Sequence, residues 1–343
     1  MTVTIRHGDC REVLRTMPAE SVHCCVTSPP YWGLRDYGVA GQIGLEVSPE
    51  AFVAEMVDVF EEVRRVLRSD GTLWLNLGDS YMGGGRGGGA DNCKQRTNVG
   101  SLDAAPNQRV AGYKQKDLVG IPWMVAFALR RAGWYLRQDI IWSKPNPMPE
   151  SIGDRCTKAH EYLFLLSKSS RYHYDAAAIR EDRTSNEDAK TFRGDCYVQG
   201  ETDNSTMGKR KVVGNKRVKV PGGWDKGPGA HGTIHRSGRT EAEYVEADVP
   251  TGRNKRSVWT VATQGFAEAH FATFPPALIE PCILAGCPAG GTVLDPFGGA
   301  GTTGMVADRL QRDAILIELN PEYAAIADRR IRGDAGMFAQ VSA

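Results

Sequence analysis

A short apolar stretch that runs into a glycine-rich turn constrains the fold of this chain more than any other feature. Thr292–Leu294 predicts a buried strand, Asp295–Gly304 supplies the turn, and Met305–Leu310 predicts the helix that follows. Glycine lets a ligand approach the backbone closely, and a helix N-terminus offers unpaired N–H groups. This strand–turn–helix unit therefore indicates an α/β fold with a ligand site at the end of a strand.

An acidic residue ends the next predicted strand. Ala314–Ile317 is apolar and Glu318 follows it, where such folds place the carboxylate that accepts from ribose hydroxyls. Gly299-x-Gly301-x-x-Gly304 formally matches the dinucleotide fingerprint. By itself this pattern indicates only a ligand that contains adenosine.

Seven apolar segments predict strands, and helical patterns separate many of them. The segments are Val3–His7, Val22–Thr27, Thr72–Leu77, Tyr135–Trp142, Glu161–Leu166, Thr292–Leu294 and Ala314–Ile317. The clearest helix runs from Pro49 to Arg68, because its apolar residues recur on one face. A mostly parallel sheet in a three-layer α/β/α sandwich is therefore expected.

The second predicted strand ends in Ser28-Pro29-Pro30-Tyr31. Each proline lacks an N–H and fixes φ at about −65°, so the chain leaves the sheet along a stiff path. The segment presents the Ser28 hydroxyl, the Pro29 carbonyl and the Tyr31 ring. Two oxygen acceptors beside an aromatic ring suit a flat ring with an exocyclic NH2 group. Alone, these residues would fit a proline-rich turn that closes a strand better than a catalytic segment.

Together, the two segments resemble the amino-group DNA methyltransferases, which methylate cytosine N4 or adenine N6. The family's catalytic Ser/Asp/Asn-Pro-Pro-Tyr matches residues 28–31, and its Phe-x-Gly-x-Gly cofactor motif matches 297–301. The catalytic motif comes first, as in the family's circularly permuted β group. The resemblance covers most of the chain, including residues 71–79, 142–147, 160–165 and 270–275.

The resemblance implies a Rossmann-like methyltransferase fold, S-adenosyl-L-methionine as methyl donor and double-stranded DNA as substrate. Ser28 and the Pro29 carbonyl are expected to accept from the target amine, Pro30 to hold the turn, and Tyr31 to stack on the flipped base. The residues expected to bind the cofactor are Asp9, Phe271, Ala272, Thr273, Asp295, Phe297, Gly299, Gly301, Thr302 and Glu318.

Within that set, individual contacts follow from the family's pattern. Glu318 is expected to accept from the ribose, Phe297 to contact the adenosine, and Asp295 with the Gly299–Gly301 backbone to hold the methionine end. Asp9 is expected near the adenine amino group. Two neighbouring residues stay open: Asp79 fits a pocket-facing role or a turn cap, and Trp32 fits base stacking or the core.

Methyl transfer from a sulfonium is an in-line displacement that mainly needs an aligned nucleophile. The exocyclic amine is a weak nucleophile because its lone pair is conjugated into the ring. Hydrogen bonds accepted from both of its N–H groups return electron density to that lone pair. The base must first be flipped out at a cost of a few kcal/mol, which stacking of about 1–3 kcal/mol partly offsets. A serine in the first motif position favours cytosine N4, with adenine N6 as the alternative.

The polar segment 181–256 interrupts the α/β pattern. We expect residues 1–180 to form the catalytic half of one domain, 181–256 a target-recognition insertion, and 257–343 the cofactor half. Net charge is +1, so DNA affinity must come from local clusters of cations. The expected DNA contacts are Lys209, Arg210, Lys211, Lys216, Arg217 and Lys219, with a solvated loop as the alternative.

A second irregular stretch covers residues 82–116. It is rich in glycine and lacks the Gly-Lys-Ser/Thr of a phosphate-binding loop. A mobile loop beside the active site and plain disorder fit it equally well.

Cysteine and hydropathy patterns exclude several other classes. The eight cysteines form no Cys-x-x-Cys pair, and Cys282-x4-Cys287 lacks a second ligand pair, so we expect reduced thiols and no metal site. No stretch of 18 apolar residues and no N-terminal signal pattern occur, so a cytoplasmic protein without membrane contact is expected.

Other functions explain fewer of these residues. A nicotinamide-dependent oxidoreductase would not need Ser28–Tyr31, and a C5-cytosine enzyme would need a nucleophilic cysteine, for which Cys282 after Pro281 lacks a catalytic loop. RNA or protein amide methyltransferases that resemble this pattern usually carry Asn-Pro-Pro-Tyr after the cofactor motif. A homodimer is expected, whereas the recognition sequence and any restriction partner cannot be read from the sequence.

Overall fold

The computed structural model of the chain describes residues 1–34, 36–83, 110–150, 152–182, 252–265, 274–335 and 340–342. These residues divide between two compact units, Met1–Ile179 with Arg256–Ala343, and Arg180–Lys255. The first unit contains every helix and strand discussed below. The predicted recognition role of 181–256 stays a prediction, because the basic cluster at 209–219 lies outside the described residues, as do residues 271–273 and most of 82–116.

One sheet organises the first unit. Its described strands follow the order β6-β4-β5-β3-β2-β7-β8-β1-β9. Their bounds are β1 Thr2–His7, β2 Val22–Thr27, β3 Leu67–Leu77, β4 Tyr135–Ser143, β5 His160–Ser167, β6 Val258–Thr260, β7 Thr292–Asp295, β8 Asp313–Glu318 and β9 Gln340–Ser342. Strand β5 is antiparallel to both β3 and β4, and the other neighbours pair in parallel.

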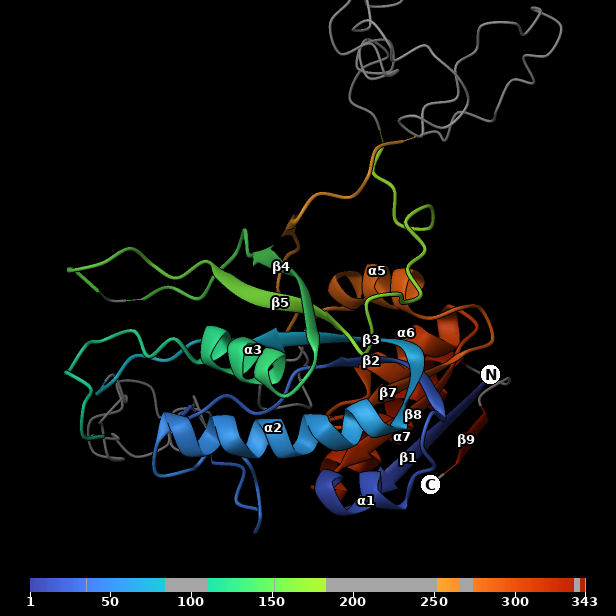
Figure 1. Ribbon diagram of the computed structural model, residues 1–343, viewed down its shortest axis with the longest axis horizontal. Coiled ribbons are helices and arrows are strands. Elements are labelled where there is room, and N and C mark those ends of the chain that lie inside the picture. Colours follow the sequence, from blue (N-terminus) through green and yellow to red (C-terminus); the bar gives the residue numbers. More distant parts are fainter. Residues whose placement is uncertain are drawn as a thin grey trace, which may run out of the picture. The chain divides into compact units, whose positions relative to one another are not determined.

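Helices cover the two faces of this sheet (Figure 1). They are α1 Cys10–Thr16, α2 Pro49–Val66, α3 Ile121–Arg131, α5 Pro276–Gly286, α6 Thr302–Arg309 and α7 Pro321–Ala335. Buried residues of α1, α2 and α3 share one hydrophobic cluster with the sheet, and those of α5, α6 and α7 share another. The predicted three-layer α/β/α sandwich is confirmed.

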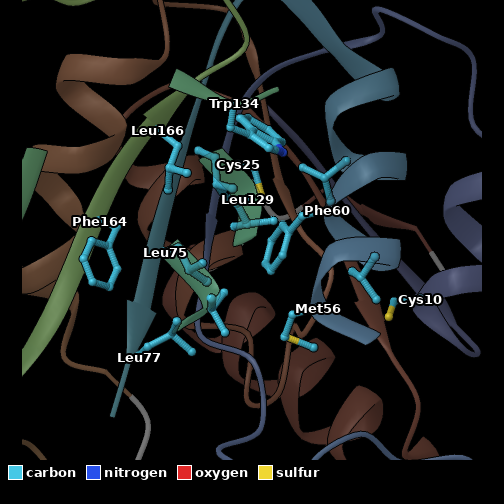
Figure 2. Packing of buried hydrophobic residues seen from close by; sticks show 14 of the residues in the cluster. Cys10, Cys25, Met56, Phe60, Leu75, Leu77, Leu129, Trp134, Phe164 and Leu166 are labelled. Atoms are coloured by element: carbon cyan, nitrogen blue, oxygen red, sulfur yellow. The ribbon is translucent and has the colours of Figure 1, made fainter. Parts of the chain in front are cut away.

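Helix α2 shows how the sequence produces one of these layers. The Ser48 hydroxyl accepts from the Ala51 N–H at 3.2 Å, and Pro49 occupies the first turn, where its missing N–H is harmless. Met56 and Phe60 are fully buried and pack toward Leu75 of strand β3 (Figure 2). Burying each such side chain contributes about 1.5–3 kcal/mol, so packing against the sheet stabilises the helix more than its cap does.

All seven predicted strands are present, and the differences lie at ends and edges. The helix predicted through Arg68 ends at Val66, because Leu67 takes an extended backbone and pairs with Val22. Strands β6 and β9 were missed, since each has three residues and lies at an edge of the sheet.

Two findings concern membrane spans and metal sites among the described residues. None of the described helices is long and apolar enough to cross a membrane. Within the same part of the chain, no group of three or more His, Cys, Asp or Glu residues is arranged to hold a metal ion.

Candidate active site

The topology brings the predicted catalytic and cofactor segments to one edge of the sheet. Strands β2, β7 and β8 are parallel neighbours, so their carboxyl ends, at Thr27, Asp295 and Glu318, share that edge. Because β5 runs the opposite way, its first residues, His160 and Glu161, reach the same edge. Two segments more than 260 residues apart in sequence are thus neighbours, at the position where α/β folds bind ligands.

Asp295 joins the two segments. Its carboxylate accepts from the hydroxyls of Thr27 and Thr303, each at 2.6 Å, and from the Phe297 N–H at 3.1 Å. The residue is 1% exposed, and this burial raises the pKa of the carboxyl to about 6, although the three hydrogen bonds oppose the rise. Asp295 therefore ties β2 to α6 through its side chain, and contact with the methionine end of the cofactor stays a prediction.

The glycine turn brings α6 close to the sheet. Gly301 has φ +77°, and a Cβ there would lie 2.9 Å from the Cβ of Ala327. A Cβ at Gly304 would lie 2.9 Å from side-chain atoms of Leu316 and Val3. Larger residues would push the helix outward, so these two glycines fix the N-terminus of α6 beside the end of β7.

Glu318 lies at the end of β8 and faces the glycine turn. Its two oxygens accept from the Gly299 N–H at 2.7 Å and the Asn320 N–H at 2.8 Å. Burial raises the pKa of this carboxyl, while the backbone hydrogen bonds oppose the rise. Each carboxylate oxygen has a second lone pair, so this arrangement can also accept from a pair of ribose hydroxyls.

Two other predicted cofactor residues have partners within the protein. Asp9 caps α1 by accepting from the Arg11 N–H at 2.8 Å and forms an ion pair with the Arg11 guanidinium. Burial alone would raise the pKa of Asp9, but Arg11 lowers it below its ordinary value. Thr302 accepts from Arg330 at 2.8 Å. Cofactor contacts by Asp9 and Thr302 stay predictions.

The Ser28–Tyr31 segment is anchored through the Tyr31 hydroxyl. This hydroxyl lies 2.8 Å from Oε2 of Glu161, 3.1 Å from Oδ1 of Asn76 and 3.3 Å from the Ser28 hydroxyl. Lys144 forms an ion pair with the other oxygen of Glu161. Burial, together with the negative charge of Glu161, holds the pKa of Tyr31 well above its ordinary value, so the phenol keeps its proton.

Sequence reasoning gave no role to Asn76, Lys144 or Glu161. All three lie in segments that carry the family resemblance, and each is a polar residue at the end of an apolar strand. That position was the available signal. Glu161 reaches the Tyr31 hydroxyl because β5 runs antiparallel to β3. The apolar pattern of residues 161–166 does not reveal the direction of that strand.

Neighbouring residues settle the two open assignments. Asp79 Oδ1 accepts from the N–H groups of Ser80, Gly120 and Ile121, so it caps the start of α3. Trp32 is buried and its indole N–H donates to the carbonyl of Glu46 at 2.9 Å, so it belongs to the core. The turn-cap and core alternatives are therefore the ones observed.

Cys282 lies inside α5 and is fully buried. A C5-cytosine mechanism needs an accessible thiolate, which this position does not provide.

Comparison with known proteins decides the family. A DNA methylase family model for N6 and N4 enzymes matches residues 22–329, most of the chain. The chain belongs to the N6/N4 DNA methylase family. It is 44% identical to the type II methyltransferase M.Cfr9I of Citrobacter freundii, over 96% of this chain and 88% of that protein. It is 42% identical to M.SmaI of Serratia marcescens, over 94% of this chain and 89% of that protein.

Solved structures share the fold. The cytosine-N4-specific PvuII DNA methyltransferase aligns with a TM-score of 0.57 at 18% identity, covering 96% of this chain and 87% of that one. A proposed DNA modification methylase of Thermus thermophilus, complexed with S-adenosyl-L-methionine, aligns with a TM-score of 0.55 at 23% identity, covering 99% of this chain and 100% of that one. As a member of the N6/N4 DNA methylase family, the chain is a DNA amino-methyltransferase that uses S-adenosyl-L-methionine.

The residues present fit this cofactor. Glu318 supplies acceptors for a diol, and a Cβ at Gly299 would have the Phe297 carbonyl at 3.9 Å as its nearest neighbour, so space lies beside the turn. The α6 N-terminus has no side-chain cap and no acidic residue in its first turn. A carboxylate such as that of a methionine group is favoured at such a helix end.

Proposed function

We propose that this enzyme methylates the exocyclic N4 amine of a cytosine flipped out of double-stranded DNA. The observation that carries the proposal is Ser28, a neutral hydroxyl at the first motif position, whose neighbour at 3.3 Å is the phenol of Tyr31. Adenine N6 is the alternative, because its amine presents the same two donors.

In the proposed mechanism, the Ser28 hydroxyl and the Pro29 carbonyl accept from the two N–H groups of the amine. This pairing favours a pyramidal nitrogen and directs its lone pair away from the ring. The two prolines keep both acceptors at fixed positions, so little reorganisation is needed at the moment of transfer.

Tyr31 belongs to the same segment. Its hydroxyl is buried, whereas the residue as a whole is partly exposed. We propose that the accessible part of the ring stacks on the flipped base. Such stacking contributes about 1–3 kcal/mol per base and offsets part of the cost of flipping.

On the cofactor side, Glu318 accepts from the ribose hydroxyls, and Phe297 contacts the adenosine. Asp295, Asp9, Thr302 and the backbone of Gly299–Gly301 complete the proposed site, together with Phe271–Thr273. S-adenosyl-L-methionine, when bound there, supplies an electrophilic sulfonium methyl group.

The methylated base is identified by nucleoside analysis. Duplex DNA methylated by the purified enzyme is digested to nucleosides and analysed by mass spectrometry, with DNA incubated without enzyme as control. N4-methylcytosine is the expected product. N6-methyladenine without N4-methylcytosine would overturn the assignment to cytosine.

We also propose that residues 181–256 read the DNA target and that the basic cluster contacts phosphates. Neutralising Lys209, Arg210 and Lys211 together should weaken binding to every DNA sequence. The slope of log affinity against log salt should fall by up to about 0.9 per lost contact, with unchanged cofactor affinity. An unchanged salt slope would make the cluster a solvated loop.

The type II names of the relatives favour a role in restriction–modification, which we include in the proposal. We also propose that the protein forms a homodimer. Sedimentation of the purified protein across a concentration series tests the dimer, because a purely monomeric protein at every concentration would exclude it.

A further inference from the structure

Four polar groups form a chain that leads away from the proposed base amine. The Ser28 hydroxyl lies 3.3 Å from the Tyr31 hydroxyl, which lies 2.8 Å from Oε2 of Glu161. The other Glu161 oxygen pairs with the Lys144 ammonium. Glu161 and Lys144 are 16% and 17% exposed, so the far end of the chain is close to solvent.

The ion pair fixes the direction of the hydrogen bonds. Glu161 bears no proton when paired with Lys144, so it accepts from Tyr31. Tyr31 has one proton to donate, and its oxygen is then an acceptor for the Ser28 proton. Ser28 in turn presents lone pairs on its remaining side. The carboxylate thus makes a hydroxyl, which could donate or accept, an acceptor toward the base amine.

Asn76 provides a second position for the Tyr31 proton. Its amide orientation is set because Nδ2 donates to the carbonyl of Tyr162 at 3.1 Å, which leaves Oδ1 at 3.1 Å from the Tyr31 hydroxyl. If Glu161 becomes protonated and donates to Tyr31, the Tyr31 proton can turn to Oδ1 of Asn76. The chain therefore has an acceptor for each of two proton arrangements.

We propose that Glu161, held by Lys144, orients Ser28 as an acceptor through Tyr31 and receives the proton released by methyl transfer. This inference rests on the proposed role of Ser28 in the reaction. Glu161 acts through Tyr31 and Ser28, so it is a positioning residue for the reacting amine.

The proposed reaction needs no proton acceptor other than these residues and water. The amine nitrogen forms a bond to the methyl carbon while the carbon–sulfur bond breaks and its electron pair stays on sulfur. The cationic amine gives one proton to Ser28 Oγ, Ser28 gives its own proton to Tyr31, and Tyr31 gives its own to Glu161. The neutral carboxyl beside Lys144 then loses its proton to water.

Other charges face this carboxylate. Lys158 and Asp79 lie close enough to interact with this group of residues, since Asp79 and Glu161 raise the pKa of Lys158 while burial, the larger effect, lowers it. Arg155 also acts on Lys158. Because several charges surround Glu161, the decisive test changes hydrogen-bond direction rather than pH.

The test uses Glu161→Gln, alone and with Lys144→Met. With Lys144 present, the new amide should turn its oxygen toward the ammonium and its NH2 group toward Tyr31. The Tyr31 oxygen then accepts from this amide in place of Ser28, and its own proton turns to Oδ1 of Asn76 or to Ser28. The Ser28 proton therefore loses its acceptor and points at the amine. We expect the single-turnover methylation rate to fall about 100-fold, within the range for positioned proton acceptors. Affinities for DNA and cofactor should be unchanged.

Removing Lys144 frees the amide to present its oxygen to Tyr31. The double variant should therefore recover about tenfold in rate over Glu161→Gln alone, although two changes would add their losses if the ion pair were merely structural. Recovery supports the inference, and a double variant no faster than Glu161→Gln overturns it. Thermal melts and cofactor titration on each variant show that folding is intact.

The identity of the methylated base and the role of Glu161 are tested by separate measurements. Nucleoside analysis of the wild-type product decides between the amines of cytosine and adenine. The rates of the variants test the role of Glu161 on whichever amine is methylated, because both amines must lose one proton.

Discussion

Two carboxylates at the same edge of the sheet have opposite surroundings. Asp295, at the end of β7, accepts from two hydroxyls and one backbone N–H, and its pKa is raised to about 6 by burial. Glu161, at the start of β5, accepts from the Tyr31 hydroxyl and pairs with Lys144. The first is enclosed between β2 and α6, whereas the second retains access to water.

These different surroundings suit one carboxylate to a structural role and the other to a role in the reaction. A carboxylate enclosed by neutral donors can hold two strand ends together. A carboxylate paired with a cation near the surface can accept a proton and release it. We infer that Asp295 joins the catalytic and cofactor segments and that Glu161 serves the reaction itself.

The largest expected effect comes from crowding the catalytic side. A Cβ at Gly78 would lie 2.4 Å from Cε2 of Tyr31, so Gly78→Ala should displace the ring. A shift of about 1 Å in a catalytic group can cost about 100-fold, and we expect a loss of that size in the single-turnover rate. Cofactor affinity, measured by calorimetry, should not change.

Gly153→Ala is the matched control, because a Cβ there meets nothing within 4 Å. It should methylate at the wild-type rate. Normal activity of Gly78→Ala would show that the position of Tyr31 does not limit the reaction.

On the cofactor side, Glu318→Ala should weaken S-adenosyl-L-methionine binding by roughly 1.5–3 kcal/mol, the range for hydrogen bonds to a charged group. Calorimetry measures this, with the exposed Glu322→Ala as control. Equal affinities for wild type and Glu318→Ala would remove Glu318 from the cofactor site.

The smallest effect concerns Asp295 and pH. Folding raises its pKa from 3.8 to about 6, so the neutral carboxyl is favoured in the folded chain. Its contribution to the free energy of unfolding is full below the unfolded pKa and is lost as pH rises through about 6.

Relative to Asp295→Asn, which does not titrate, wild type should therefore lose about 1–1.5 kcal/mol between about pH 5 and about pH 7.5. Urea unfolding at both pH values measures the difference. A wild type that gained stability over this interval, relative to the variant, would show that Asp295 is stabilised as an anion.

Much of the fold followed from local pattern. The period of the apolar residues located α2, and the prolines ended β2 at Thr27 as expected. The β6 and β9 edge strands escaped detection, because three residues carry too little pattern and their pairing is set by distant neighbours.

The sequence located two candidate segments whose chemistry lies within one stretch, Ser28–Tyr31 and Asp295–Gly301, and the topology places both at one edge of the sheet. The Tyr31–Glu161 contact could not be predicted, since it joins residues 130 positions apart and depends on the direction of β5. The hydrogen bonds of Asp295 to the Thr27 and Thr303 hydroxyls could not be read from the sequence for the same reason, and its contact with the cofactor stays a prediction.

The central claim is that Ser28 acts on the transferred amine and not on the cofactor. Single-turnover methylation and cofactor affinity, measured on the same preparation of Ser28→Ala, test it most directly. We expect a rate at least about 10-fold below wild type with unchanged affinity for S-adenosyl-L-methionine, because a lost transition-state acceptor affects the chemical step. A near-normal rate would contradict it.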